Sequence, residues 1–241
     1  MSSQGKQNTS PPEAVKSTLR EYFESICVAV ILALFIRTFV VQAFKIPTGS
    51  MEQNLLIGDH LLVNKMVYAL PGVSLERQLL PIRDIQRKDI VVFKYPNEPE
   101  RDFIKRVIGL PGDTIRIENK RVFINEQPLD EPYVFFSRPP DGPETGVFYD
   151  LRRDNMPETA IPENHYFVMG DNRDNSHDSR FWGTLPREFV KGRALIVYWS
   201  YDAPREAYLA TGLLERAKEI GSVAIHFFSR TRWKRFFHLV R

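Results

Sequence analysis

The first clear pattern along the chain is a long apolar run. From Ile26 to Phe44 the sequence reads ICVAVILALFIRTFVVQAF, nineteen residues in which only Arg37, Thr38 and Gln42 are polar. A helix of that length is about 28 Å long, close to the hydrocarbon thickness of a bilayer. Arg37 lies in the second half of the run, where its side chain can reach toward an interface. The pattern predicts a transmembrane helix over residues 25–44.

Two alternatives to an uncleaved anchor stay open at this point. A cleaved signal peptide has a shorter apolar region and a small-x-small cleavage site, whereas Gln42, Phe44 and Lys45 follow here. A buried core helix is the other alternative. Residues 1–24 are predicted to be a leader, polar at its start. The positive-inside rule gives no orientation, because lysines and arginines flank both ends of the run.

After the apolar run, short segments dense in β-branched and aromatic residues alternate with Gly, Pro, Asn and Asp. Seven such segments are predicted strands: 59–68, 89–95, 102–110, 113–119, 121–125, 164–170 and 193–200. Glu118-Asn119-Lys120 between two of them indicates a hairpin turn. The sequence therefore predicts a mainly β, antiparallel domain that comprises residues 45–125 and 164–241.

Two segments depart from this pattern. Residues 126–163 are rich in proline and charge, and are predicted to form an inserted, loop-rich lobe. At the C-terminus, RTRWKRFFHLVR (230–241) carries basic residues and no acid, with Trp233, Phe236, Phe237 and Val240 on one face of a predicted helix. That helix either lies on anionic lipid or packs against its own domain.

Composition narrows the class of protein. The 33 basic and 30 acidic residues give a net charge of +3, which does not indicate a nucleic-acid binder. Cys27 is the single cysteine, so an internal disulfide and a cysteine-based zinc site are excluded. None of the five histidines has a second histidine at metal-ligand spacing. No metal site and no cofactor are predicted.

A candidate nucleophile follows the apolar run directly. In KIPTGSMEQNLLIGD (45–59), Ser50 comes after a proline and a glycine. The chain has no G-x-S-x-G, H-E-x-x-H or G-x-x-x-x-G-K-[ST] motif. A serine without a histidine can use a lysine as its base, provided that burial lowers the pKa of that lysine toward neutrality.

DFIKRVIGLPGD (102–113) supplies a lysine of this kind. In a strand, Phe103, Lys105 and Val107 share one face, and Arg106 points to the other. On this pattern alone Lys105 is more typical of a partly buried strand lysine than of a catalytic base. Further along, Gly170–Arg180 contains three aspartates, two asparagines, two serines and two arginines. That loop is either an orienting polar network or a solvated turn, and its spacing does not fit an EF-hand.

Taken together, three motifs resemble those of type I bacterial signal peptidases, the membrane-anchored serine endopeptidases of peptidase family S26. They are IPTGSMEQNLLIGD, FIKRVIGLPGD and GDNRDNSHDSRFWG, in this order after an apolar segment. The resemblance extends from about Ile26 to Ser200 and is weakest in 126–163. It implies an antiparallel β-sheet catalytic domain of signal peptidase type with an N-terminal transmembrane helix.

The resemblance also implies roles for individual residues. Ser50 would be the nucleophile and Lys105 its general base. Ser176 would hydrogen-bond the lysine amine, and an Asp178–Arg180 salt bridge would hold the loop. The Ser50 backbone N–H and the Thr48 hydroxyl would form the oxyanion hole, where some family members have serine in place of Thr48. A Ser-His-Asp triad through His177 is not expected, because the family uses no histidine.

The implied substrates are preproteins that carry a signal peptide, cleaved through an acyl-enzyme without a cofactor. Shallow pockets that accept small side chains are expected from these apolar or kink-forming residues: Phe44, Ile46, Pro47, Met51, Leu55, Phe103 and Ile104. The implied location is the inner (plasma) membrane, with a single span, residues 1–24 in the cytoplasm and the catalytic domain on the outer, periplasmic side. The lipid bilayer and, by proximity, the secretion translocon are the other expected partners, and nucleic acid is not.

Two rival functions remain at this stage. A self-cleaving Ser-Lys repressor shares the dyad and a β-rich core, but it carries a DNA-binding helix-turn-helix, which this sequence lacks. A membrane-tethered β-module without activity would need no buried lysine beside Ser50.

Overall fold

The computed structural model describes residues 18–68, 82–136, 151–202 and 213–240, with the backbone alone for 151–152 and 213–220. It divides into two compact units, Met1–Phe39 and Val40–Arg241. Most of the predicted leader (1–17) and the centre of the predicted lobe (137–150) lie outside the described residues.

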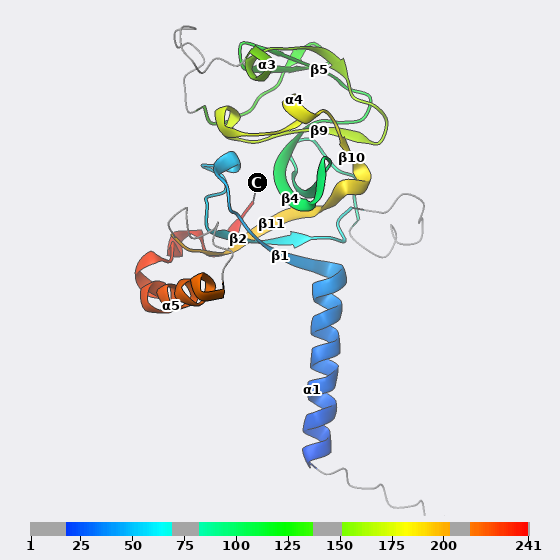
Figure 1. Cartoon of the computed structure of the whole chain (residues 1–241). Helices are drawn as coiled ribbons and strands as arrows, with labels where there is room; N and C mark the ends of the chain where they lie inside the picture. The colour runs from blue at the N-terminus through cyan, green and yellow to red at the C-terminus, as the bar shows by residue number, and fades with distance from the viewer. Residues whose placement is uncertain (1–17, 69–81, 137–150, 203–212, 241) are drawn as a thin grey trace, which may run out of the picture. The chain divides into compact units, whose positions relative to one another are not determined.

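The described part of the first unit is a single apolar helix. Helix α1 (Thr18–Phe35) continues as a π-helical turn, η1 (Ile36–Val40) (Figure 1). Thr18–Val40 has a mean hydropathy of 2.2 over its most apolar window, none of which is buried, and is the one helix of the described residues long and apolar enough to cross a membrane.

These bounds differ from the predicted range 25–44 at both ends. The helix begins earlier, where Arg20 and Glu24 form an i,i+4 ion pair. It ends earlier because Val41–Lys45 forms strand β1, whose backbone pairs with the strand at residues 59–64.

The second unit contains a large antiparallel sheet with the order β1-β2-β11-β3-β4-β9-β10, and β12 pairs with β11 outside this path (Figure 1). Its remaining strands are β2 (Asp59–Asn64), β3 (Ile90–Tyr95), β4 (Glu98–Gly109), β9 (His165–Met169), β10 (Leu185–Pro186), β11 (Val190–Ser200) and β12 (His238–Leu239). The mainly antiparallel β class is confirmed.

A smaller sheet has the order β7-β6-β5-β8. It is formed by β5 (Thr114–Glu118), β6 (Arg121–Ile124), β7 (Gln127–Pro128) and β8 (Met156–Ala160), next to the short helix α3 (Leu151–Asp154). The hairpin between β5 and β6 turns at Asn119 and Lys120, which both have positive φ, as a type I′ turn requires. Strands β7 and β8 fall within the predicted loop-rich lobe, so the part of that lobe that the structure describes is largely built into this sheet.

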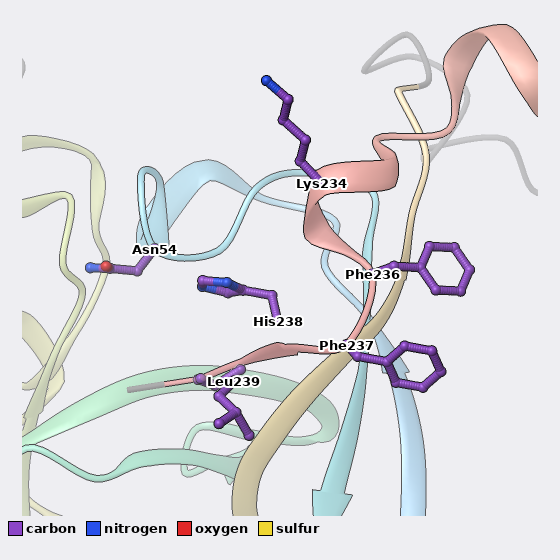
Figure 2. Close-up of a pocket in the computed structure, with 7 residues that line it drawn as sticks. Asn54, Lys234, Phe236, Phe237, His238 and Leu239 are labelled. Atoms are coloured by element: carbon purple, nitrogen blue, oxygen red, sulfur yellow. The ribbon is translucent and has the colours of Figure 1, made fainter.

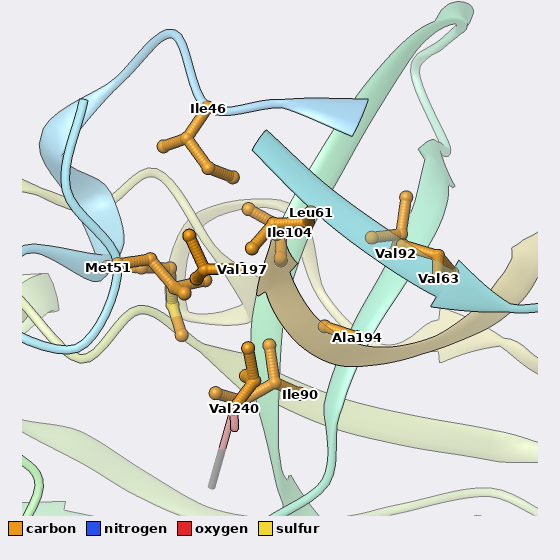
Figure 3. Close-up of a cluster of buried hydrophobic side chains, with 11 residues drawn as sticks. Ile46, Met51, Leu61, Val63, Ile90, Val92, Ile104, Ala194, Val197 and Val240 are labelled. Atoms are coloured by element: carbon orange, nitrogen blue, oxygen red, sulfur yellow. The ribbon is translucent and has the colours of Figure 1, made fainter. Parts of the chain in front are cut away.

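Three clusters of buried apolar side chains form the core. The cluster next to Ser50 combines residues from β2, β3, β4 and β11 with the segment that follows β1 and with Val240 after β12 (Figure 3): Ile46, Met51, Leu55, Leu61, Val63, Ile90, Val92, Ile104, Ala194, Val197 and Val240. A second cluster supports the smaller sheet, and a third lies around Val91, Phe93 and Val107. Since Val91 pairs with Lys105 in the sheet, the lysine leaves β4 on the face of this third cluster.

Short turns position the loops: the 3₁₀ turns η2 (Gly49–Met51), η3 (Arg173–Asn175), η4 (Arg187–Phe189) and η6 (Trp233–Arg235), and helix α4 (Ser179–Trp182). Helix α5 (Leu213–Arg230) precedes η6. The helix predicted over 230–241 is therefore wrong, because the chain turns at Phe237 with positive φ and continues as β12. Val240 then enters the core, so the segment packs against its own domain.

Candidate active site

Ser50 lies in the tight turn η2, immediately after the extended Thr48. The turn is closed by hydrogen bonds from the Glu52 amide to the Gly49 carbonyl (3.1 Å) and from the Leu55 amide to the Met51 carbonyl (2.7 Å). Ser50 is buried, whereas Pro47 and Thr48 are exposed. The chain therefore carries the hydroxyl from the surface into the interior within three residues.

Lys105 reaches this hydroxyl from β4. Its Nζ lies 2.6 Å from Ser50 Oγ, and the lysine is 4% exposed. Burial lowers the pKa of Lys105 to about 8, an effect that the Asp178 and Asp171 carboxylates oppose and the Arg180 guanidinium reinforces. An amine with this pKa is partly neutral near physiological pH, and a neutral amine can accept the proton of the hydroxyl.

The apolar surroundings of the amine come from its own strand and the next one. The Phe103 ring lies 5.5 Å from Lys105 Nζ, and Tyr95 stacks on this ring at a centroid distance of 4.5 Å. Aromatic rings on this side exclude water from the amine, which is the condition that the low pKa requires.

Asp178 and Arg180 form the predicted salt bridge. Arg180 Nε and Nη2 donate to the two Asp178 carboxylate oxygens at 2.8 and 2.9 Å, and the Gly170 amide donates to the same carboxylate at 3.0 Å. Burial alone would raise the pKa of Asp178, but the Arg180 guanidinium and these hydrogen bonds hold it below its usual range. The pair thus fixes the loop that follows β9.

Ser176 differs from expectation. Its buried hydroxyl makes no hydrogen bond of standard geometry among the described residues, and so none to Lys105, although it lies close enough to Asp178 to help lower the pKa of that carboxyl. The hydroxyl packs against the Cα of Gly170. A Cβ at Gly170 would stand 2.3 Å from Ser176 Oγ and 2.5 Å from the Ser50 carbonyl oxygen, so only glycine allows these two serines to approach each other.

Asn172 is a contact that the sequence did not single out. Its amide donates to the Ser50 carbonyl at 3.1 Å, and its side-chain Nδ2 donates to the Gly49 carbonyl at 3.2 Å. One residue of the polar loop thus holds the carbonyls of both Gly49 and Ser50. The density of Asp and Asn in this loop was the available signal, but it does not say which member makes the contact.

A second bridge joins the segment that follows Ser50 to strand β4, which carries Lys105. Asn54 Nδ2 donates to Asp171 Oδ2 at 2.7 Å, and Asp171 accepts from Arg106 Nε and Nη2 at 2.8 and 2.6 Å. The Arg106 guanidinium also lies 4.0 Å from the Tyr133 ring centroid. Since Arg106 follows Lys105 in β4, this bridge and the Ser50–Lys105 contact connect the same two segments of the chain.

The residues expected to form pocket walls fall into two groups. Met51 and Leu55 have no exposed surface, and Ile46 and Ile104 are also buried in the core cluster. Phe44 and Phe103 are partly buried, and Pro47 is exposed. Only this second group offers surface to a ligand, and the first group is part of the buried core next to the Ser50 turn.

His177 contacts aromatic side chains and not Ser50. Its Nε2 lies 3.1 Å from the Tyr95 hydroxyl, and its ring stacks on Phe181 at 5.4 Å. In the described part of the chain, no group of three or more His, Cys, Asp or Glu side chains is arranged to hold a metal ion. The geometry is thus that of a serine hydroxyl with a buried amine as its neighbour.

Comparisons with known proteins identify a family for this chain. A family model described as signal peptidase, peptidase S26, matches residues 19–199. Signal peptidase I of Pseudomonas aeruginosa is 38% identical over 216 residues, which cover 79% of this chain and 76% of the relative. Signal peptidase I of Aquifex aeolicus is 32% identical over 233 residues, 77% of this chain and 86% of the relative. A crystal structure of a signal peptidase I from Enterococcus faecalis matches 46% of this chain and 97% of its own, with 30% identity and a TM-score of 0.39.

Proposed function

Because the chain belongs to the signal peptidase family, peptidase S26, it is a serine peptidase that acts on preproteins, and we propose that it cleaves their signal peptides through a Ser50–Lys105 dyad. One observation carries the proposal. A lysine amine buried from solvent, with its pKa lowered to about 8, lies 2.6 Å from a buried serine hydroxyl.

In the proposed reaction Ser50 Oγ attacks the scissile carbonyl while Lys105 Nζ takes the hydroxyl proton. The tetrahedral intermediate collapses to an acyl-enzyme, and the ammonium of Lys105 returns its proton to the leaving amine. Water, deprotonated by the same amine, then attacks the ester; the ester bond breaks, the ammonium of Lys105 returns the proton to Ser50 Oγ, and the new carboxylate leaves. Lys105 carries the proton in both half-reactions, and its amine must be neutral when each of them begins.

The negative oxygen of the intermediate requires hydrogen-bond donors. The Ser50 backbone N–H and the Thr48 hydroxyl are the proposed donors. Thr48 lies two residues before the nucleophile with an extended backbone (φ −129°, ψ 155°) and is exposed, so a substrate carbonyl can reach this part of the turn. Its β-branch restricts the hydroxyl to fewer rotamers than a serine would have.

The remaining residues are proposed to position this pair and the substrate. Asp178 and Arg180 hold the loop that carries Ser176 and Asn172 against the nucleophile turn. Phe44, Pro47 and Phe103 offer surface for small substrate side chains. Ile46, Met51, Leu55 and Ile104 form the apolar support beneath.

The same proposal places the protein in the membrane. The family and the apolar helix Thr18–Val40 fit a membrane-anchored protein. We assign α1 as the single span of an inner membrane, the leader to the cytoplasm and the β-unit to the outer side, near the translocon. A signal peptide inserts as an apolar helix, so a tethered peptidase meets its cleavage site at a raised effective concentration.

The direct test is to incubate the detergent-solubilised chain with a preprotein and to sequence the new N-terminus. Cleavage directly after the signal peptide is expected for the wild type, and none for Ser50→Ala or Lys105→Ala. Ser229→Ala and Lys94→Ala are matched controls at exposed positions and are expected to cleave at the wild-type rate. Substantial turnover by either dyad variant would reject the proposal.

A further inference from the structure

The smaller sheet is connected to the polar loop of the site, Gly170–Arg180, by a buried ion pair. Arg173 of this loop donates two hydrogen bonds to the carboxylate of Glu131, which lies three residues after β7: Nη1 is 2.9 Å from Oε2, and Nη2 contacts Oε1. The side chains of Arg173 and Glu131 are 2% and 10% exposed. We propose that Glu131 is a positioning residue of the peptidase, which acts through Arg173 on the place where the polar loop meets the Ser50 turn.

Arg173 connects the ion pair to Gly170. Its Nε donates to the Gly170 carbonyl at 3.3 Å, and the amide of the same glycine donates to Asp178 at 3.0 Å. Gly170 is also the residue that packs against Ser176 Oγ and the Ser50 carbonyl, with no room for a Cβ. The Arg173 guanidinium therefore holds the glycine at the closest approach of the polar loop to the Ser50 turn.

The backbone of Arg173 takes part in the same arrangement. Its carbonyl accepts a hydrogen bond from Arg180 Nη2 at 2.8 Å, and the same nitrogen donates to Asp178 at 2.9 Å. After burial, the Asp178 carboxylate has the largest effect on the pKa of Lys105. A displacement of Arg173 would therefore disturb the salt bridge that acts on the proposed base.

The Glu131 carboxylate keeps Arg173 charged and oriented inside the protein. Burial alone would lower the pKa of Arg173, but the carboxylate in contact with it raises that pKa above its usual range. A guanidinium carries its donors in one rigid plane, so a carboxylate that binds Nη1 and Nη2 together also fixes the direction of Nε. Because Nε is the atom that reaches Gly170, the ion pair sets the geometry of that contact.

The segment from Glu131 to Phe135 is attached to the polar loop by its backbone as well. The Phe135 amide donates to the Asp171 carbonyl at 2.8 Å, and the Arg173 amide donates to the Phe135 carbonyl at 3.0 Å. These two hydrogen bonds form an isolated parallel bridge between the segment and the loop. The carboxylate of Glu131 is thus presented to Arg173 by a segment whose place is fixed independently of the ion pair.

The same segment also contacts the chain that follows Ser50. The Tyr133 carbonyl accepts a hydrogen bond from Asn54 Nδ2 at 3.0 Å. Asn54 borders a pocket that the C-terminal residues line on its other sides, and Figure 2 shows the Asn54 amide directed away from Lys234 and Phe236. The amide is therefore turned toward the segment that carries Glu131.

The smaller sheet holds the polar loop at a second place. Lys120 of the β5–β6 hairpin donates from Nζ to Asp174 Oδ1 at 3.0 Å, and the carbonyl of Arg153 in α3 accepts from Arg180 Nη1 at 3.3 Å. Of these attachments, the Glu131 ion pair is the one that leads to Gly170. Glu131 is therefore the residue of the smaller sheet whose loss should alter the Ser50 turn.

The first experiment compares Glu131→Gln with Glu158→Gln, the same change at an exposed position of β8. Glu131→Gln places an amide against the buried guanidinium, so Arg173 loses the charge that orients it. Since a displacement of about 1 Å can cost about 10²-fold, we expect kcat on a preprotein to fall about 10- to 100-fold. KM should change by less than about twofold, because Arg173 is buried and offers no surface to a substrate. Glu158→Gln should keep both wild-type constants.

A second measurement separates misplacement from a loss of folded protein. A fluorescent β-lactam that acylates Ser50 gives an amplitude, which counts the chains able to react, and a rate for each of those chains. A folded but misplaced site reacts slowly at full amplitude, whereas partial unfolding lowers the amplitude and leaves the rate unchanged. We expect the slow reaction for Glu131→Gln. A rate equal to that of Glu158→Gln, at any amplitude, would overturn the proposal.

The combination of Glu131→Met with Arg173→Met is the second variant, and it decides the question if Glu131→Gln does not fold. Replacing a buried ion pair by apolar residues is often neutral for stability, so the double variant should fold. It offers no donor to the Gly170 carbonyl, and its acylation rate should stay about 10- to 100-fold below the wild type. A wild-type rate in this variant would mean that the ion pair serves folding alone, and would overturn the proposal.

This inference rests on the proposed dyad, and the two fail differently. If Ser50 is not the nucleophile, Ser50→Ala is still acylated and still cleaves preprotein. If Glu131 has no positioning role, Ser50→Ala is inactive while Glu131→Gln is acylated at the wild-type rate.

Discussion

Lys105 and Arg106 are consecutive residues of β4, and their side chains enter two differently built polar regions on opposite faces of the strand. Both are buried, at 4% and 1% exposure. Arg106 meets Asp171 in a bidentate salt bridge. Lys105 meets a hydroxyl and the aromatic ring of Phe103, and Asp178 and Asp171 act on it only at longer range.

Lys105 and Arg106 differ in the groups that they contact and not in how deeply they are buried. A buried cation with a carboxylate in contact keeps its charge and has a structural role. A buried amine without one is destabilised in its charged form, so its pKa falls. Two consecutive residues of the strand thus carry a guanidinium in contact with a carboxylate and an amine whose pKa is lowered by burial.

The largest effect on cleavage is expected from replacing Lys105 by a residue that cannot accept a proton. Lys105→Arg keeps a cation at the site but cannot become neutral, so cleavage should fall by at least about 10³-fold, as in Lys105→Ala. The measurement is kcat/KM on a preprotein, with Lys94→Arg as the control. A Lys105→Arg enzyme within tenfold of the wild type would show that proton transfer to this residue is not required.

The two faces are expected to respond to the loss of charge with opposite signs. Arg106→Met leaves Asp171 buried and unpaired, which should lower the free energy of unfolding by about 3–5 kcal/mol. Lys105→Met removes a cation that burial destabilises, and should raise it by about 3 kcal/mol at pH 7, at about 1.4 kcal/mol for each unit by which the pKa is lowered. Denaturant unfolding of both variants gives the comparison, and two losses of similar size would contradict it.

The gain in Lys105→Met should depend on pH. With a folded pKa of about 8 against 10.5 unfolded, the unfolded chain binds more protons between these values. Stability of the wild type therefore rises with pH from about 8 to 10.5, and the advantage of the methionine shrinks across that window. An advantage that stays constant from pH 7 to pH 10.5 would mean that Lys105 titrates normally.

Asp178→Asn is expected to cost less, about 10- to 100-fold in kcat/KM. The variant removes a carboxylate that raises the pKa of Lys105 and leaves the Arg180 guanidinium unopposed. The acid limb of the pH–rate profile should therefore move to lower pH even as the rate at the plateau falls. If the acid limb of the pH–rate profile does not move, the loss of kcat/KM comes from a change in the loop structure alone.

The smallest effect on cleavage is expected from the Asn54–Asp171 hydrogen bond, which connects the Ser50 turn to the Asp171–Arg106 salt bridge. Asn54→Ala removes a donor to Asp171 but leaves the Arg106 salt bridge intact. We expect kcat to fall about three- to tenfold with little change in KM, because the nucleophile turn loses one of its attachments. Asn54→Asp places a second carboxylate against Asp171, and should be worse than Asn54→Ala. If Asn54→Ala and Asn54→Asp lowered kcat equally, the Asn54–Asp171 hydrogen bond would have no part in holding Asp171.

Much of this organisation was visible in the sequence, because strands and the apolar helix follow local rules. Each of the seven alternating segments contains an observed strand, and Asn119-Lys120 turns as predicted. The pairing of Ser50 with Lys105 was expected only from a family resemblance, and the structure places Lys105 Nζ 2.6 Å from Ser50 Oγ. Local composition did not distinguish Lys105 from any other strand lysine.

The errors arose where a distant partner decides the local structure. Val41–Lys45 continues the apolar run and reads as helix, but its pairing with β2 makes it a strand. Met156–Ala160 lies in a proline-rich stretch and becomes a strand only against β5. The aromatic spacing after Arg230 fits a helix, yet Val240 is drawn into the core while Phe237 turns outward. The Asn172 contact to the nucleophile joins residues 122 positions apart, which no local pattern reports.

The most direct measurement is a titration of Lys105 itself. Lysines labelled with ¹³C at Cε are observed by NMR in the detergent-solubilised chain across pH 6 to 11, and Lys105→Ala identifies the resonance. A midpoint near 8 is predicted for this resonance. A midpoint near 10.5 would mean an amine that stays charged beside Ser50, and would contradict its role as the base.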